Sequence, residues 1–239
     1  MRFSVLGSGS KGNAVYVESG STSVLIDNGL SGKELDRRLQ LIDRSIHDIK
    51  GVCITHEHND HIGGVGVVSR RCKVPVYANE GTYRGAKAKL GKLYKRYGFE
   101  NGDKLSIGDL QIQAFPVSHD TIDPVGYVVS DGSCYLGICT DTGMVTKLME
   151  LRLARCQGLV LEFNHNLEML KRGPYPLPLQ QRVRSNKGHL SNEDGAKLLQ
   201  SLIHPGLKYG VLAHLSEINN NPDLAHGAAL SCDFSENPE

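Results

Sequence analysis

The segment His56-Glu57-His58-Asn59-Asp60-His61 is the part of the sequence whose residue types most clearly predict chemistry. Imidazole nitrogens and carboxylate oxygens bind zinc and similar divalent metals. Where a strand passes into a loop, residues two positions apart can share one metal, and the turn carries residues four and five positions on toward a second. The pattern therefore predicts part of a site for two cations, with a solvated polar loop as the alternative interpretation.

Four ligands in one loop cannot complete two metal sites, so further ligands must come from other parts of the chain. Three candidates each lie just past an apolar, strand-like run: His119 after residues 114–118, Asp141 after residues 135–140, and His214 after residues 211–213. A side chain at the end of a strand emerges at the rim of a sheet. A single histidine in such a place is more often structural, but three such placements together with the loop favour a metal site.

The elements that must position these residues are short strands followed by a mixture of strands and helices. Strands are predicted from apolar runs and alternation at Arg2–Leu6, Ala14–Glu18, Ser23–Asp27, Ile49–Thr55, Val74–Tyr77, Leu110–Phe115, Val125–Val129, Cys134–Thr140, Gly158–Phe163 and Tyr209–Ala213. Helices are predicted at Gly32–Leu41, Ile62–Ser69, Glu80–Lys89, Met144–Leu153 and Asn192–Leu202. The Pro-rich stretch Gly173–Leu179 is predicted to be an exposed loop. This order favours sheets packed together with helices on their outer faces.

Composition places the chain among ordinary globular proteins. The 239 residues are 39% apolar and 22% charged, and we expect residues 1–239 to form a single domain. A net charge of +1 provides no general attraction to nucleic acid, so any polyanion must bind a local patch. No apolar run approaches the roughly 20 residues of a membrane span. The six cysteines form no CxxC pair, and we expect a cytoplasmic protein without disulfides or membrane association.

With these candidates in place, the sequence resembles the metallo-β-lactamase superfamily and, within it, the YycJ (WalJ) subgroup. The blocks that carry the resemblance are residues 7–13, 25–29, 140–143, 162–165, 188–192 and 214–216 with Asn219-Asn220, and together they extend over nearly the whole chain. The resemblance implies an α/β (α+β) fold, the four-layer αβ/βα sandwich, with the metal site at one edge. Two departures are present: Asn166 stands where the subgroup has Asp, and the chain ends soon after the last helix-like segment.

The resemblance also implies how the ligands divide. His56, His58 and His119 would bind the first metal, Asp60, His61 and His214 the second, and Asp141 would bridge both. Two divalent cations are expected, with zinc first and manganese or iron as alternatives. Such a pair lowers the pKa of water from about 15.7 to about 7, so a metal-bridging hydroxide is the expected nucleophile. Asp60 is also expected to be catalytic, because it can orient that hydroxide.

Other residues are candidates for supporting roles. Asp27 ends a strand and could hold the N–H of a ligand histidine, although a plain turn residue before Asn28-Gly29 would look the same. Ser8, Ser10 and Asn13 could bind substrate phosphate, with a hairpin turn as the alternative. His189, just before a helix, could bind phosphate or protonate a leaving oxygen, and it is predicted to be both substrate-binding and catalytic. His165 is a weaker candidate.

Two basic tracts suggest the substrate. One contains Arg84, Lys87, Lys89, Lys92, Lys95 and Arg96, and the other contains Lys171, Arg172, Arg182, Arg184 and Lys187. Such runs are often solvated faces, but beside a metal site they would follow a phosphate backbone. We therefore expect a nucleic-acid substrate and a phosphodiesterase or nuclease, which the YycJ resemblance specifies as a 5′-to-3′ DNA exonuclease. The sequence predicts no oligomeric state.

Three other functions fit parts of the pattern. Thioester hydrolysis of the glyoxalase II kind is the main alternative, because the ligand pattern alone does not separate it from phosphodiester hydrolysis. Flavodiiron redox proteins share the implied fold, but they carry Glu at the second ligand position, where this chain has His58. A non-catalytic metal-binding module is disfavoured, because a closed structural zinc site needs four ligands and seven candidates are present.

Overall fold

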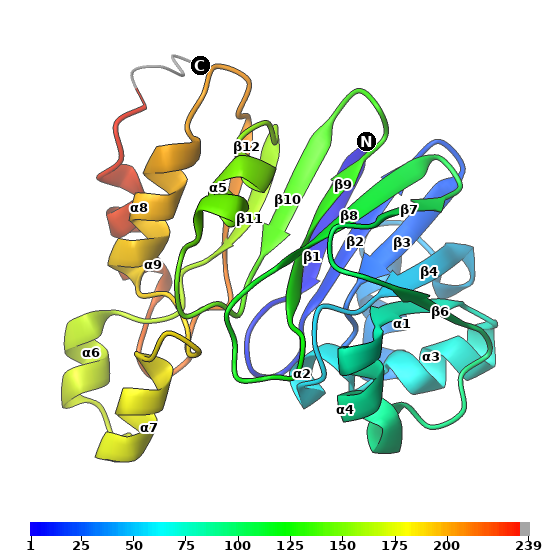
Figure 1. Cartoon of the computed structure of the whole chain (residues 1–239), viewed down its shortest axis with the longest axis horizontal. Helices are drawn as coiled ribbons and strands as arrows, with labels where there is room; N and C mark the ends of the chain where they lie inside the picture. Colours follow the sequence, from blue (N-terminus) through cyan, green and yellow to red (C-terminus); the bar gives the residue numbers. More distant parts are fainter. Residues whose placement is uncertain (235–239) are drawn as a thin grey trace. The chain divides into compact units, whose positions relative to one another are not determined.

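The computed structural model describes residues 1–234 of the chain, whose strands pair into two mixed six-stranded sheets flanked by helices (Figure 1). The strand orders are β1-β2-β3-β4-β5-β6 and β12-β11-β10-β9-β8-β7. Their contacts divide the chain into two compact units. Unit 1 contains residues 1–114, 121–125 and 129–133, and unit 2 contains residues 115–120, 126–128 and those from 134 onward. The expectation of a single domain stays a prediction.

The first sheet belongs to unit 1 and changes from antiparallel to parallel pairing. Its strands are β1 (Arg2–Gly7), β2 (Ala14–Ser19), β3 (Thr22–Ile26), β4 (Ile49–Cys53), β5 (Val76–Asn79) and β6 (Arg96–Phe99). The first three form an antiparallel meander, whereas β3, β4, β5 and β6 run parallel. Every residue of β3 is buried, as a parallel strand covered on both faces requires. The chain after β3 and the chain after β4 therefore leave the sheet at the same edge.

Helices cover this sheet and supply the rest of its core. They are α1 (Gly32–Gln40), η1 (Ile46–Asp48), α2 (Asn59–Ile62), α3 (Val65–Cys72) and α4 (Glu80–Leu90), and Figure 1 shows α1, α3 and α4 beside the parallel strands. Ser31 caps α1 by accepting from the Glu34 backbone N–H. Leu35 and Leu39 on its inner face are fully buried in the core cluster. The antiparallel hairpin of β7 (Lys104–Ile107) and β8 (Leu110–Pro116) follows.

Unit 2 is built on three parallel strands, and helices connect one strand to the next along the chain. Its strands are β10 (Tyr135–Cys139), β11 (Gly158–Glu162) and β12 (Tyr209–Ala213), and β9 (Val125–Ser130) precedes them in the second sheet. Its helices are α5 (Lys147–Leu153), α6 (Leu167–Arg172), α7 (Leu177–Val183), α8 (Asn192–Leu202) and α9 (Pro222–Leu230). The core joins β11 to α5, α8 and α9 through apolar residues such as Leu161, Leu153, Leu198 and Ala225. The ends of β10, β11 and β12 also share one edge.

Most predicted elements lie within a few residues of the observed ones, and the differences are local. The short strands β6 and β7 and the helices α6, α7 and α9 were not predicted. The helix expected at Ile62–Ser69 begins only at Val65, after Gly63-Gly64, as α3, and the short helix α2 before these glycines was not predicted. The loop expected at Gly173–Leu179 covers the connection 173–176 only, because α7 begins at Leu177 behind Pro176. No helix among residues 1–234 has the length and apolar character of a membrane span.

Gly29 sets how closely the turn after β3 approaches the histidine loop. A methyl group at Gly29 would overlap the Asp60 backbone carbonyl. We expect Gly29→Ala to lower the free energy of unfolding by about 1–3 kcal/mol, because the two backbones must move apart. Urea unfolding measures the change. Gly227→Ala is the matched control: its added methyl group meets no atom within 4 Å in α9, so it should stabilise by up to about 1 kcal/mol. Equal stabilities for the two variants would contradict the expectation.

Candidate metal centre

The histidine loop of unit 1 begins at the end of β4, beside the end of β3. Ile26 and Cys53 are paired at the ends of these parallel strands, so Asp27 and Thr55 leave the sheet as neighbours. The Asp27 carboxylate accepts from the Thr55 backbone N–H at 2.8 Å and from the Thr55 hydroxyl at 2.7 Å. It also binds His61 Nδ1 at 2.8 Å. Of the two roles that the sequence left open for Asp27, the structure shows the contact with a histidine.

The ligand candidates of the loop lie close together and are largely buried. The ring centroids of His56 and His61 are 4.0 Å apart, and those of His56 and His58 are 4.9 Å apart. His61 Nε2 lies 3.5 Å from Asp60 Oδ2. His56 and His61 are 1% and 0% exposed. Because Asp27 holds His61 at Nδ1, its Nε2 faces Asp60 and is the nitrogen that can bind a metal.

The glycine-serine segment at residues 7–13 contacts this loop through Asn13. The Asn13 backbone N–H donates to the Asp60 carbonyl at 2.7 Å, and the side-chain amide lies 3.1 Å from Asp60 Oδ2 and 2.9 Å from His61 Nε2. Asn13 is 7% exposed, whereas Ser8 and Ser10 are exposed at the surface of the segment. Asn13 is thus placed to hold the metal-ligand candidates, and substrate binding by the three residues stays a prediction.

In unit 2, the parallel strands β10, β11 and β12 end at the same edge and bring three polar groups together. Asp141 follows β10, Glu162 is the last residue of β11, and His214 follows β12. His214 Nε2 lies 3.4 Å from Asp141 Oδ1. Ligand atoms of Asp141, Glu162, His189 and His214 all lie within 4.8 Å of one another, a grouping that could hold a metal ion. His189 is therefore part of this cluster.

Glu162 is the residue of this cluster that the sequence analysis missed. It is 0% exposed, and its Oε1 lies 2.8 Å from His189 Nδ1 and 3.0 Å from His214 Nδ1. The backbone N–H groups of Thr142 and Leu190 donate to Oε2 at 3.0 and 3.2 Å. The sequence did contain a signal for Glu162, because it ends a continuous apolar strand. A carboxylate buried at such a position must have a hydrogen-bonding or charged partner.

The hydrogen bonds of Glu162 also set its charge and that of His189. Burial favours the neutral acid, but His189 and His214 outweigh it and lower the pKa of Glu162. Burial likewise lowers the pKa of His189, but the neighbouring Glu162 raises it above the usual value. The protonated form of His189 therefore persists to a higher pH than in an ordinary histidine. A histidine in this state can act as a proton donor.

His119 is oriented from its other side by the loop before His189. Its Nδ1 lies 3.0 Å from the Gly188 carbonyl, and its Nε2 lies 3.8 Å from Asp141 Oδ1. Burial lowers the pKa of His119, which favours the neutral imidazole that binds metals. Ser118 donates to the Asn186 carbonyl at 2.7 Å and joins the same two segments. The chain from residue 118 to 120 is thus held against the loop at 184–188.

The donor chemistry of the two clusters fits divalent cations. In four of the predicted ligand histidines Nδ1 binds a protein oxygen: Thr55 Oγ1 for His56, Asp27 for His61, the Gly188 carbonyl for His119, and Glu162 for His214. Such a bond fixes the orientation of the imidazole and leaves Nε2 as the ligand atom. Each unit therefore presents histidine Nε2 atoms together with an aspartate. The assignment of individual ligands to two metals stays a prediction.

Three site residues have a left-handed backbone that non-glycine residues rarely adopt. The φ angles are 61° at Asp27, 58° at Asp141 and 56° at His214. Each residue comes within two positions of a strand end, where the chain must turn sharply to place a side chain on the sheet rim. Local strain of this kind collects at functional sites and is maintained by the surrounding structure. The backbone thus supports the predicted importance of these positions.

Two other features bear on the predictions. Asn166, where the resemblance implies Asp, caps α6 by accepting from the backbone N–H groups of Glu168 and Met169. An Asp side chain makes the same kind of cap, so either residue can start this helix.

His165 is buried, and burial lowers its pKa to about 4.

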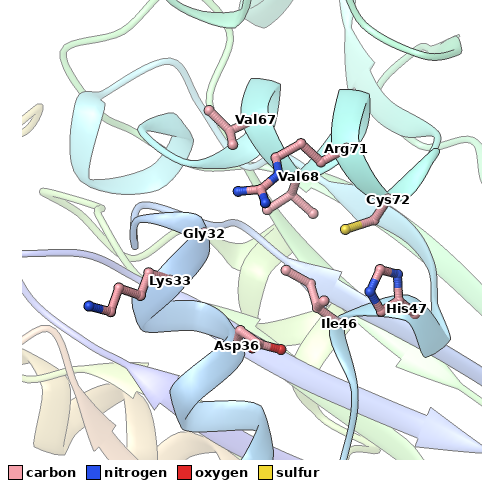
Figure 2. Close-up of a pocket in the computed structure, with 9 residues that line it drawn as sticks. All are labelled: Gly32, Lys33, Asp36, Ile46, His47, Val67, Val68, Arg71 and Cys72. Atoms are coloured by element: carbon pink, nitrogen blue, oxygen red, sulfur yellow. The ribbon is translucent and has the colours of Figure 1, made fainter.

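A pocket of about 520 Å³ lies elsewhere in unit 1, between α1, η1 and α3 (Figure 2). It is lined by Gly32, Lys33, Asp36, Ile46, His47, Val67, Val68, Arg71 and Cys72. The thiol of Cys72 and the carboxylate of Asp36 point between the helices, whereas Lys33 points away (Figure 2). None of the predicted site residues lines this pocket. It is therefore not the candidate catalytic site.

Comparison with known proteins identifies the class. The model of the β-lactamase superfamily domain matches residues 22–211. The exodeoxyribonuclease YycJ of Bacillus anthracis is 39% identical over 227 residues, which cover 94% of this chain and 86% of that protein. The exodeoxyribonuclease WalJ of Streptococcus pneumoniae serotype 2 is 40% identical over 229 residues, covering 94% of this chain and 85% of that protein. The chain belongs to the metallo-β-lactamase superfamily and, within it, to the family of YycJ and WalJ.

Solved structures agree on the fold. The metallo-β-lactamase fold protein YhfI of Bacillus subtilis superimposes with a TM-score of 0.76 at 18% identity, over 98% of this chain and 93% of that chain. The expected metallo-β-lactamase fold and metal-dependent hydrolase are thereby confirmed.

Asp27→Asn tests the support of the unit 1 cluster. Loss of the carboxylate weakens the hold on His61 Nδ1, and we expect metal affinity to fall about 10–100-fold. Titration against a chelating indicator measures the affinity. Asp109→Asn is the control, because Asp109 also accepts from backbone and hydroxyl groups, at Ser21 and Thr22, but contacts no histidine. If the two variants bind metal equally well, Asp27 has no such role.

Glu162→Gln tests the support of the unit 2 cluster. A neutral amide no longer raises the pKa of His189, so its protonated form is lost at a lower pH than in the wild type. We expect the alkaline limb of the kcat profile to move to lower pH and metal affinity to fall about 10–100-fold. Glu168→Gln, on the exposed face of α6, is the control. An unchanged pH profile in Glu162→Gln would argue against the coupling.

Proposed function

We propose that this protein is a metal-dependent exodeoxyribonuclease that digests DNA from the 5′ end. The observation that carries the proposal is the identity of 39–40% with two exodeoxyribonucleases along 94% of the chain. The histidine and carboxylate clusters at the strand ends support it, because phosphodiester hydrolysis at neutral pH is a reaction that divalent cations promote. The direction of digestion comes from the YycJ resemblance.

We propose the ligand division that the family resemblance implies. His56, His58 and His119 bind one cation, Asp60, His61 and His214 bind the other, and Asp141 is shared. Zinc is the first expectation, and manganese and iron suit the same donors. When bound, the cations supply a nucleophile derived from water and neutralise charge on the phosphate oxygens.

The residues of the chain then have distinct tasks. Asp27 and Asn13 hold His61 and Asp60, so the orientation of Asp60 toward the attacking oxygen does not depend on exposed groups. His189, whose pKa the adjacent Glu162 carboxylate raises, donates a proton to the leaving 3′ oxygen of the nucleotide. His189 and Glu162 lie in the same unit, so this part of the site is preorganised by the sheet edge.

We also propose a cytoplasmic location. All six cysteines are free thiols in the structure, the state that a reducing compartment maintains. Burial raises the pKa of Cys156 to about 12, which keeps it protonated and unreactive.

A substrate panel tests the function. The purified protein, assayed for metal content and with zinc or manganese added back, should release the label early from DNA labelled at the 5′ end and late from DNA labelled at the 3′ end. It should also hydrolyse bis-p-nitrophenyl phosphate and leave a glutathione thioester intact. Faster thioester turnover would favour the glyoxalase II alternative.

Asp60→Ala, compared at full metal loading, tests the catalytic residue. We expect kcat to fall about 100-fold or more, the effect of removing a positioned acid–base group. Asp223→Ala, at an exposed position in the first turn of α9, should keep wild-type turnover. Normal turnover by Asp60→Ala would remove Asp60 from the mechanism.

A further inference from the structure

Helix α6, helix α7 and the loop that follows α7 form a basic and largely exposed segment of unit 2. Residues 167–188 contain five cations, Lys171, Arg172, Arg182, Arg184 and Lys187, and one carboxylate, Glu168. No side chain of α7 is buried, so packing against a core does not explain the helix. Within α7 itself only Arg182 is charged, and the other cations lie in α6 and in the loop after α7. An exposed segment with this charge is suited to contact a polyanion.

The segment is attached to the chain that carries a predicted metal ligand. Arg182 Nε lies 2.6 Å from the carboxylate of Asp120, the residue after His119. The Val183 carbonyl accepts from the His189 backbone N–H at 2.9 Å, so the end of α7 is connected directly to His189. Gly188 is required here, because a methyl group would overlap the Arg182 and Val183 carbonyls. The loop therefore has a defined position beside the unit 2 cluster.

Two cations of this loop have no carboxylate partner within residues 1–234. Arg184 and Lys187 are both exposed, and neither forms an ion pair with any of the residues that the structure describes. Arg182 is already neutralised by Asp120, so it serves as the anchor of the loop. Lys187 precedes His189 by two residues and Arg184 by five. The two unpaired cations are thus close in the sequence to His189, the proposed proton donor.

The other basic tract differs in its surroundings. Arg96 pairs with Glu80 and lies over the Tyr83 ring at 3.9 Å, and Lys95 lies over the Tyr97 ring at 4.7 Å. Arg96 therefore connects β6 to α4, whereas Lys95 contacts a ring of β6 itself. Lys87 and Lys89 of the same tract are exposed on α4 and provide a matched pair of surface charges.

We propose that the loop at residues 182–188, which we name the basic loop, binds the phosphate backbone of the DNA strand whose terminal nucleotide is being removed. The inference rests on the proposed function. Arg184 and Lys187 contact phosphates beyond the scissile one, and the Arg182–Asp120 pair holds the loop at a constant distance from His119. Contacts with phosphates carry no sequence information, so the loop guides strands of any sequence.

The test compares Arg184→Gln/Lys187→Gln with Lys87→Gln/Lys89→Gln. Both pairs remove two positive charges from exposed positions. Binding of a long single-stranded oligonucleotide is measured by fluorescence anisotropy in EDTA over a range of salt concentrations. Steady-state kinetics with added metal compare that oligonucleotide with a dinucleotide, which is too short to reach the basic loop.

The proposal expects a selective effect. Arg184→Gln/Lys187→Gln should weaken strand binding about 10-fold and reduce the slope of log affinity against log salt by about 1.4, or about 0.7 for each lost phosphate contact. The ratio of kcat/KM for the long strand to that for the dinucleotide should fall by a similar factor, through KM. Arg184→Lys/Lys187→Arg should bind as the wild type does, because the charges remain.

Two results would overturn the proposal. Equal losses in the two double variants would mean that total charge matters and the basic loop does not. Unchanged strand affinity in Arg184→Gln/Lys187→Gln, with DNA still digested, would remove the loop from the substrate path and leave the proposed function intact. If the wild type neither binds nor digests DNA while it hydrolyses bis-p-nitrophenyl phosphate, the proposed function fails, and this inference fails with it.

Discussion

The site depends on two buried carboxylates that hold histidine Nδ1 atoms, Asp27 in unit 1 and Glu162 in unit 2. A buried carboxylate is stable only when its lone pairs are satisfied, and each of these accepts backbone N–H bonds as well as imidazole bonds. The same bonds determine which nitrogen of each ring faces outward. Without the Asp27 carboxylate, the predicted ligand His61 would lose the bond that fixes its tautomer and ring orientation.

How far the sequence could predict this arrangement depends on how local the determining interactions are. His119, Asp141 and His214 could be predicted because each follows an apolar run that encodes a strand by itself. Glu162 was overlooked because it was taken as part of the strand Gly158–Phe163, and its partners His189 and His214 are distant in the chain. Helices α6 and α7 were missed for a different reason. They are short, and α7 buries no side chain, so neither has a strong amphipathic pattern.

The strand ends of both units share a backbone feature. Asp27, Asp141 and His214 all adopt left-handed φ angles, although only glycine does so at no steric cost. The chain accepts this strain in both units at the point where a parallel strand ends and a polar side chain must face the rim. Asn166 shows the opposite situation, because its side chain is needed only as a helix cap and either Asn or Asp satisfies that need.

Because a single oxygen of Glu162 serves both His189 and His214, these two histidines are not energetically independent. A substitution at one of them changes the charge and position of the carboxylate that the other one uses. Their effects on the protein should therefore be non-additive, as is usual for members of one hydrogen-bond network. If His189 is the proton donor and His214 a metal ligand, as we propose, the leaving-group chemistry cannot change without disturbing metal retention.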